Sequence, residues 1–193
     1  MARYHVRTIT RDDFSTLMGL ENKLFGADHG GVLGPYYVRL CCEFFPETCL
    51  VVEVDGNAVG YVLSFVRDRE AYCTTLAMLP EFQGSRATHA LLRGFVAAIA
   101  ERVDTCWFTV EETNKAARAL HAMLGAKEVE VRADFYGPGA ARIVSRIERD
   151  AFERLRGRFE RIGLVGSTQK RSSEVTELTP PREETPAHVA QVA

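Results

Sequence analysis

The stretch from Gln83 to Thr88, with the sequence QGSRAT, has the composition of a phosphate-binding helix start. It follows a strand-like segment at 71–79, and an apolar periodicity of helical type continues from it to about Arg102. The first turn of an α-helix leaves backbone N–H groups unpaired and carries about half a positive charge, which favours a bound phosphate. We expect the amides of Gly84 to Thr88 to form a pyrophosphate site. A capped helix start that binds nothing is the alternative.

The cysteines do not form the pattern of a metal site or of a disulfide framework. Their number is odd, no Cys-x-x-Cys occurs, and no histidine stands at ligand spacing from them. We therefore expect no bound metal and no catalytic thiol, but small buried side chains. The five are Cys41, Cys42, Cys49, Cys73 and Cys106.

Composition and charge argue against two classes of partner. The 193 residues include 24 Lys or Arg and 26 Asp or Glu, so no positive surplus exists for nucleic acid. The longest apolar stretch, 87–100, is interrupted by His89 and Arg93 and is shorter than the about 20 residues of a membrane span. The first ten residues lack the apolar core of a secretory signal. We expect a cytoplasmic protein with no membrane and no nucleic-acid partner.

The elements that must position these residues follow the order β α α β β β α β α β β. Alternation and β-branched runs predict the strands, and apolar spacing of three and four predicts the helices. This order predicts an α/β chain with an α+β mixed sheet, in which antiparallel strands precede two crossover helices. The strands are expected at 3–9, 48–54, 58–66, 71–79, 105–110, 127–135 and 142–147, and the helices at 10–25, 35–45, 84–102 and 114–124.

The residues after 148 divide into two segments. Phe152, Leu155, Phe159 and Ile162 recur at steps of three and four, which predicts an amphipathic helix over 149–166. We expect this helix to dock on its own sheet, and a homodimer contact is the alternative. Residues 167–193 hold three of the seven prolines and show no periodicity, so they are expected to form a disordered tail.

Residues 76–92, LAMLPEFQGSRATHALL, resemble the acetyl-CoA-binding segment of the GCN5-related N-acetyltransferase (GNAT) superfamily. In that superfamily a strand leads through a Pro-Glu-aromatic turn into a Gln/Arg-x-x-Gly-x-Gly/Ala loop that opens a long helix. The segment 55–61 is similar to the superfamily's hairpin, and 110–125 to its second CoA-contacting strand and helix. The resemblance implies a GNAT acyltransferase domain over 1–148 with three layers, a central mixed sheet and helices on both faces.

The resemblance further implies an acyl-CoA-dependent N-acetyltransferase, with acetyl-CoA as the donor and the primary amine of a small molecule as the acceptor. Arg86 and Thr88 stand where the superfamily usually has glycine, which lets phosphates approach the backbone closely. An arginine there can add a guanidinium to the pyrophosphate site or obstruct it, and the sequence leaves both open. The cofactor-binding residues that the resemblance implies are Leu76, Met78, Gln83, Gly84, Ser85, Arg86, Ala87, Thr88 and Asn114.

Amide formation needs a neutral amine, a polarised thioester carbonyl and a proton for the departing thiolate. His121 stands at the position of the superfamily's tyrosine acid, so the resemblance implies that it supplies the proton. The superfamily polarises the carbonyl with a backbone amide at a strand bulge, which by position is Met78 here. Glu111, at the end of a strand that should flank the donor, is the candidate base. The alternatives are a partly buried packing position for His121, Tyr136 or Tyr72 as the acid, Ala77 for the amide, Glu112 or Glu70 as the base, and a solvated surface position for each glutamate.

Residues 34–65 are similar to the diaminobutyrate acetyltransferases of ectoine synthesis in a Pro-Tyr pair, a Cys-rich helix and a Phe-x-x-Thr-Cys strand start. This implies an amino-acid or diamine acceptor. Its carboxylate partner is expected to be Arg39 or Arg67, and its ammonium partner Asp28, Glu43 or Glu70. Two other hypotheses stay open: a catalytically silent binding module of the same fold with an altered CoA site, and an acyltransferase that uses an acyl carrier protein or a longer acyl-CoA.

Overall fold

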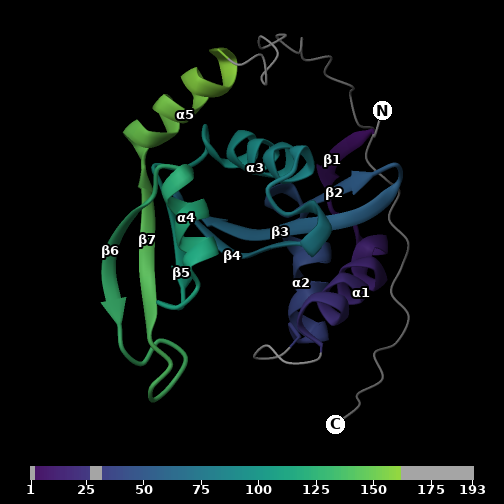
Figure 1. Ribbon diagram of the computed structural model, residues 1–193, viewed down its shortest axis with the longest axis horizontal. Coiled ribbons are helices and arrows are strands. Elements are labelled where there is room, and N and C mark those ends of the chain that lie inside the picture. The colour runs from purple at the N-terminus through teal and green to yellow at the C-terminus, as the bar shows by residue number, and fades with distance from the viewer. Residues whose placement is uncertain (1–2, 27–31, 162–193) are drawn as a thin grey trace, which may run out of the picture.

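One seven-stranded mixed sheet organises the protein in a computed structural model that describes residues 3–26 and 32–161 (Figure 1). The strand order is β1-β2-β3-β4-β5-β7-β6, and β4–β5 is the parallel pair. The strands are β1 (Tyr4–Thr8), β2 (Leu50–Val54), β3 (Asn57–Arg67), β4 (Glu70–Met78), β5 (Thr105–Val110), β6 (Lys127–Arg132) and β7 (Arg142–Glu148). The helices are α1 (Phe14–Phe25), α2 (Pro35–Phe44), α3 (Arg86–Ile99), α4 (Lys115–Met123) and α5 (Arg149–Arg161). The predicted order of elements is confirmed.

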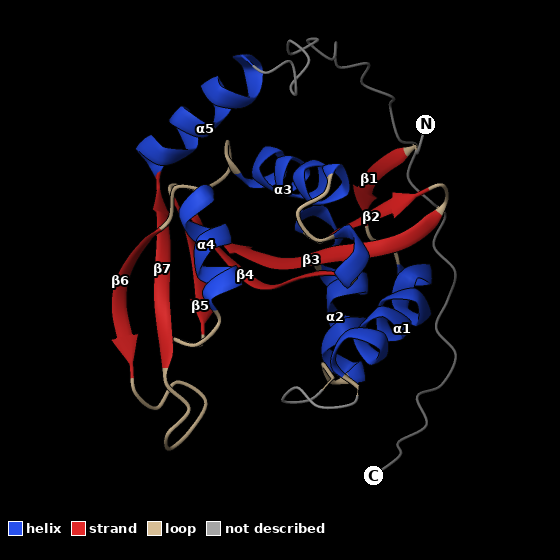
Figure 2. Ribbon diagram, viewed as in Figure 1, coloured by secondary structure: helices blue, strands red, loops and turns tan. Residues whose placement is uncertain are grey.

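Helices cover both faces of the sheet, which confirms the predicted three-layer α/β architecture. One core lies between the sheet and α3, α4 and α5. The other lies between the sheet and α1 and α2 (Figure 2). The inner strand β3 is therefore buried from Val59 to Ser64, because both of its faces are covered. All five cysteines are buried and free, as expected.

The predicted C-terminal helix forms α5 over the residues that the structure describes. Its Phe152 and Leu155 are buried in the core that α3 shares with the sheet, as their spacing predicts. The rest of the predicted helix and the predicted tail at 167–193 lie outside the described residues. Within the described part of the chain, no helix is long and apolar enough to cross a membrane, and no group of three or more potential metal ligands occurs.

The sheet opens between its two halves at the β4–β5 pair. β4 pairs with β5 only from Glu70 to Cys73, whereas β4 itself continues for five more residues, from Thr74 to Met78. β5 turns away to pair with β7 along its whole length. Figure 2 shows β3 and β4 running across the molecule while β5, β7 and β6 stand steeply to them. The divergence leaves one edge of β4 without a neighbouring strand.

Candidate active site

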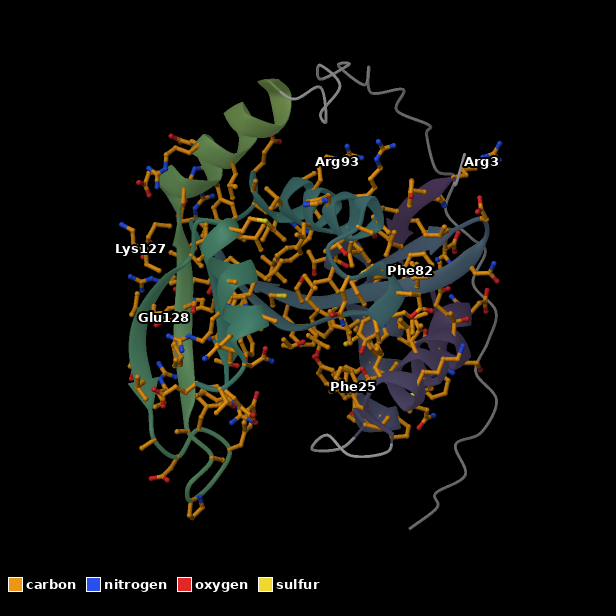
Figure 3. All side chains as sticks on the ribbon, in the orientation of Figure 1. Arg3, Phe25, Phe82, Arg93, Lys127 and Glu128 are labelled. Atoms are coloured by element: carbon orange, nitrogen blue, oxygen red, sulfur yellow. The ribbon has the colours of Figure 1, made fainter. Side chains whose placement is uncertain are left out.

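A cleft of about 780 Å³ occupies the opening between β4 and β5. One wall is the inner stripe of α4, and the others come from the two strands, from Arg142 at the start of β7 and from Phe25 at the end of α1, which Figure 3 labels. The lining residues are Phe25, Cys73, Thr74, Thr75, Leu76, Phe108, Thr109, Val110, Glu111, Asn114, Ala117, Leu120, His121, Leu124 and Arg142.

The cleft passes through the sheet from one face to the other. Phe108 and Leu124 belong to the core on the α3 and α4 side. Thr74 lies toward α2 instead, because its hydroxyl is hydrogen-bonded to that of Tyr37 and donates to the carbonyl of Leu63 at 3.1 Å. Two molecules can therefore reach the same point of the cleft from opposite faces.

The open edge of β4 directs backbone amides into this opening. The N–H of Leu79 donates to the carbonyl of Val59 at 2.8 Å, so the next pair, Gly60 and Met78, is not hydrogen-bonded. By that alternation the N–H groups of Leu76 and Met78 point away from β3, toward the side that β5 has left. The Gln83 side chain donates to the Met78 carbonyl at 3.3 Å. The strand thus presents polar backbone groups to a ligand.

The bulge in β4 lies at Thr74, so its predicted position at Met78 or Ala77 is wrong. The register with β3 passes from Ser64–Cys73 to Leu63–Thr75 and leaves Thr74 as the extra residue. Ala77 and Met78 pair regularly with Tyr61 and Gly60. The position of a bulge depends on the register of two paired strands, and the sequence of one strand does not determine that register. The Met78 amide nevertheless points into the opening, whereas Ala77 faces β3.

The start of α3 has the predicted form but lies outside the lining of the cleft. Gly84 takes a left-handed conformation with φ of 68°, and the Ser85 hydroxyl accepts the N–H of Ala87 at 3.1 Å as the N-cap. The hydroxyl of Thr88 is turned inward and donates to the Phe82 carbonyl at 2.7 Å. Arg86 is exposed at the first helical position. Thr88 therefore replaces a glycine without covering the helix start.

His121 lines the cleft from α4 with its ring 4.5 Å from that of Phe108. The side chain is buried, and Nδ1 has no hydrogen-bond partner among the described residues. Burial lowers the pKa of His121 to about 4, and the charge of Glu128 opposes this only in part. The imidazole is therefore neutral at pH 7. It can donate or accept a hydrogen bond in the cleft, but it does not hold the second proton that an imidazolium acid would give up.

Glu111 and Arg142 form an ion pair of 2.9 Å at the rim of the cleft. Glu111 is 59% exposed, and the Arg142 guanidinium lies 5.0 Å from the ring centroid of Tyr136. The pair leaves the carboxylate open to solvent and holds it beside the entrance. Among the lining residues, Glu111 supplies the carboxylate, so it can accept a proton from a molecule that enters the cleft.

A protein-family model decides the identity of this fold. The model of the acetyltransferase (GNAT) family matches residues 17–126, which are more than half of the chain and include every cleft residue except Arg142. The chain belongs to the GNAT family. The resemblance of the 76–92 segment is thereby confirmed.

Curated relatives of this GNAT chain include two acetyltransferases. The L-2,4-diaminobutyric acid acetyltransferase of Nocardia farcinica is 29% identical over 96 residues, which are 48% of this chain and 50% of that protein. The ribosomal protein bS18-alanine N-acetyltransferase of Haemophilus influenzae is 32% identical over 83 residues, 42% of this chain and 56% of that protein. The chain thus matches only about half the length of these curated relatives.

Solved structures show the same fold over about three quarters of the chain. Ard1 from Thermoplasma volcanium superposes with a TM-score of 0.65 at 16% identity, over 75% of this chain and 97% of that one. The diaminobutyrate acetyltransferase of Paenibacillus lautus, determined with L-2,4-diaminobutyric acid and coenzyme A, gives 0.62 at 19% identity, over 77% and 96%. At these identities the likeness concerns the fold alone.

The remaining candidates of this GNAT chain are placed away from the cleft. Glu112 and Tyr136 are exposed outside its lining, and Glu70 lies at the far end of β4, where it accepts a hydrogen bond from Thr105 at 3.5 Å. Tyr72 does not line the cleft, but its hydroxyl lies 2.8 Å from that of Thr109, which does. Burial raises the pKa of Tyr72 to about 12.

The residues expected to bind the acceptor are not brought together. Arg39 donates to the Arg11 carbonyl and pairs with Glu43 on the outer side of α2, and Arg67 pairs with Asp68 in solvent. None of them lines the cleft, because the helix and the hairpin that carry them turn these side chains outward; Asp28 lies outside the described residues. The structure instead offers Phe25, Arg142 and the threonines at 74, 75 and 109. Only the placement of Arg142 at a predicted strand start signalled one of these in advance.

Glu21 supports the α1 wall of the cleft from inside the helix. It is 1% exposed, and its Oε2 accepts the N–H of Leu33 at 2.8 Å, while Oε1 has no partner among the described residues. Phe25, one turn further along α1, lines the cleft. The carboxylate therefore holds the segment that enters α2 beside the helix end that forms the cleft wall.

Replacing Glu21 by glutamine should remove a pH dependence of stability. Burial raises the pKa of Glu21 above its ordinary value of 4.5, so the wild-type chain loses stability as the pH rises from 4.5 through the folded-state pKa. The variant keeps an oxygen for Leu33 but has no charge to bury. Its unfolding free energy relative to the wild type should rise by about 1.4 kcal/mol for each unit of the pKa shift. Urea unfolding at pH 4.5 and 7 measures this, with exposed Glu43→Gln as the control, and an unchanged difference contradicts it.

Proposed function

We propose that this chain is an acyl-CoA-dependent N-acetyltransferase that moves the acetyl group of acetyl-CoA to the primary amine of a small molecule. The observation that carries the proposal is the passage through the sheet where β4 and β5 diverge. It gives a donor on one face and an acceptor on the other access to a common point, which is what the joining of two bound molecules requires. Membership of the GNAT family supports the same reaction.

The α4 side of the cleft fits the donor. The N–H groups of Leu76 and Met78 can bind the amide groups of a CoA arm, and the small side chain of Ala117 leaves space on the α4 wall. The amides from Gly84 to Thr88 at the start of α3, with the Arg86 guanidinium, would hold the pyrophosphate. Acetyl-CoA, when bound, supplies the thioester carbonyl that an amine attacks.

Two residues that line the cleft, Glu111 and His121, have separate roles in the transfer. An alkylammonium with an ordinary pKa near 10.4 needs about 4 to 5 kcal/mol to lose its proton at pH 7. We assign that proton to the Glu111 carboxylate, which Arg142 holds at the rim. His121 donates a hydrogen bond from its neutral N–H to the leaving thiolate, because the imidazolium is not populated at pH 7. The thiolate takes its proton from the attacking nitrogen, so that CoA leaves as the thiol.

Acetyl-CoA should raise the thermal stability of the protein. A ligand at 100 times its dissociation constant adds about 2.7 kcal/mol to the free energy of unfolding. Ala117→Trp, which fills the α4 wall of the cleft, should abolish the shift, and Ala116→Trp, one exposed position earlier on the same helix, should keep it. Release of the CoA thiol from acetyl-CoA in the presence of primary amines, followed colorimetrically, tests the transfer itself. A chain that neither gains stability nor releases thiol does not use acetyl-CoA, which contradicts the proposal.

A further inference from the structure

A second pocket, of about 270 Å³, lies on the face of the sheet that α1 and α2 leave uncovered. We refer to it as the Trp107 pocket; its lining residues are Tyr72, Trp107, Thr109, Arg132, Phe135 and Val144. α1 and α2 pack over β2, β3 and the end of β4, whereas Cys106 and Phe108 of β5 face the opposite core. Alternation along β5 therefore turns Trp107 and Thr109 to the α1 face.

The Trp107 pocket adjoins the cleft at Thr109, which lines both. The Tyr72 hydroxyl lies 2.8 Å from that of Thr109 and forms the boundary between them. Trp107 precedes Thr109 by two residues, a distance of about 7 Å along a strand. A molecule whose amine lies in the cleft beside Thr109 therefore reaches Trp107 with a linker of two or three carbon atoms.

The walls of the Trp107 pocket select a flat apolar group. The Arg146 guanidinium lies 4.9 Å from the ring centroid of Trp107, and that of Arg132 lies 5.9 Å from the ring of Phe135. Both cations are already paired, Arg146 with Glu148 and Arg132 with Glu130. A carboxylate or phosphate would find no unpaired cation here, whereas an aromatic ring finds ring edges and faces. An apolar cavity of about 150 Å³ suffices for benzene.

We propose that the Trp107 pocket binds an aromatic group of the acceptor, so that the acceptor is a primary amine with a ring two or three carbons away. The statement that the acceptor is a primary amine rests on the proposed function. The same chemistry occurs in a free arylalkylamine and in the first residue of a peptide. These two sources are separated by the experiment below.

Trp107 is the single tryptophan of the chain, so its fluorescence reports on this pocket whether or not acetyl transfer takes place. 2-Phenylethylamine should change the emission saturably, and ethylamine at equal concentration should not. In the transfer assay, kcat/KM should be about 10- to 200-fold higher for 2-phenylethylamine than for ethylamine. A short peptide that begins with phenylalanine is compared with one that begins with alanine. A preference for rings in the amine pair or the peptide pair supports the proposal and names the source.

Phe135→Ala opens the wall of the Trp107 pocket at a position after β6 and should reduce the ring preference about 10-fold or more. Val131→Ala, at an exposed position of the same hairpin, is the matched control and should leave it unchanged. Saturable quenching without acetyl transfer would support the pocket and reject the activity. Equal responses to 2-phenylethylamine and ethylamine would overturn the pocket. So would emission that depends on protein concentration without any amine, since a second copy would then cover this face.

Discussion

Replacing His121 by alanine should lower the turnover number by about 10² to 10³ while the apparent affinity for acetyl-CoA changes little. The imidazole presents a buried Nδ1 that has no partner among the described residues, on the wall of the cleft where a thiolate would form. Loss of one hydrogen-bond donor to a developing negative charge costs a rate factor of that size. Because such a bond strengthens in the transition state, kcat falls more than KM changes. Steady-state kinetics with a saturating amine measures both.

The pH dependence separates this role from an imidazolium acid. With a pKa of about 4, His121 should produce no step in kcat near pH 6.5. His121→Tyr supplies a hydroxyl donor and should keep much of the activity, and exposed His5→Ala should keep all of it. His121 binds a proton near pH 6.5 in the unfolded chain but only near pH 4 in the folded chain. The wild type should therefore lose up to about 3 kcal/mol of stability as the pH falls from 6.5 to 4. His121→Tyr should lack this loss. Full turnover in the alanine variant would show that His121 gives the thiolate no hydrogen bond.

Replacing Arg86 by glycine should weaken the binding of CoA by about 10- to 100-fold, the value of a charge-assisted hydrogen bond to phosphate. The guanidinium is exposed at the first position of α3 and has no ion pair among the described residues, so it has no other bond to give up. Titration calorimetry at two salt concentrations measures the effect, which should shrink as salt screens the charge. Arg93→Gly, two turns further along α3, is the control. Tighter binding by the glycine variant would show that Arg86 obstructs the site.

The order and bounds of most elements could be predicted because local residues set them. Asp55 and Gly56 both have positive φ, 50° and 83°, which is the turn that their types predict between β2 and β3. Asn114 caps α4 through a 3.0 Å bond from the N–H of Ala117, and Gly125 follows the helix end with φ of 79°. β5 has its predicted bounds, and the bounds of β4 differ by one residue. Each of these signals acts within a few residues of itself.

The features that depend on distant residues could not be predicted. The bulge at Thr74 arises from the register with β3, and β7 enters the sheet between β5 and β6. The low pKa of His121 results from its burial, to which residues of other elements contribute, among them Phe108 of β5 with its ring 4.5 Å away. Cys41 and Cys42 are both buried although they are adjacent on a helix, because α2 packs in one core with α1 and the sheet. Phe25 and Arg142 likewise had no local signature, because the fold brings them to the cleft from separate elements.

The passage through the sheet also determines how chains of this fold can diverge. In the proposed reaction the donor contacts come from the edge of β4, from α3 and from α4, whereas Phe25, Arg142 and Trp107 belong to the other surface. A substitution on the second surface alters the amine that fits and leaves the inherited donor contacts in place. A lineage can therefore exchange its acceptor in single steps, each of which retains a working donor half.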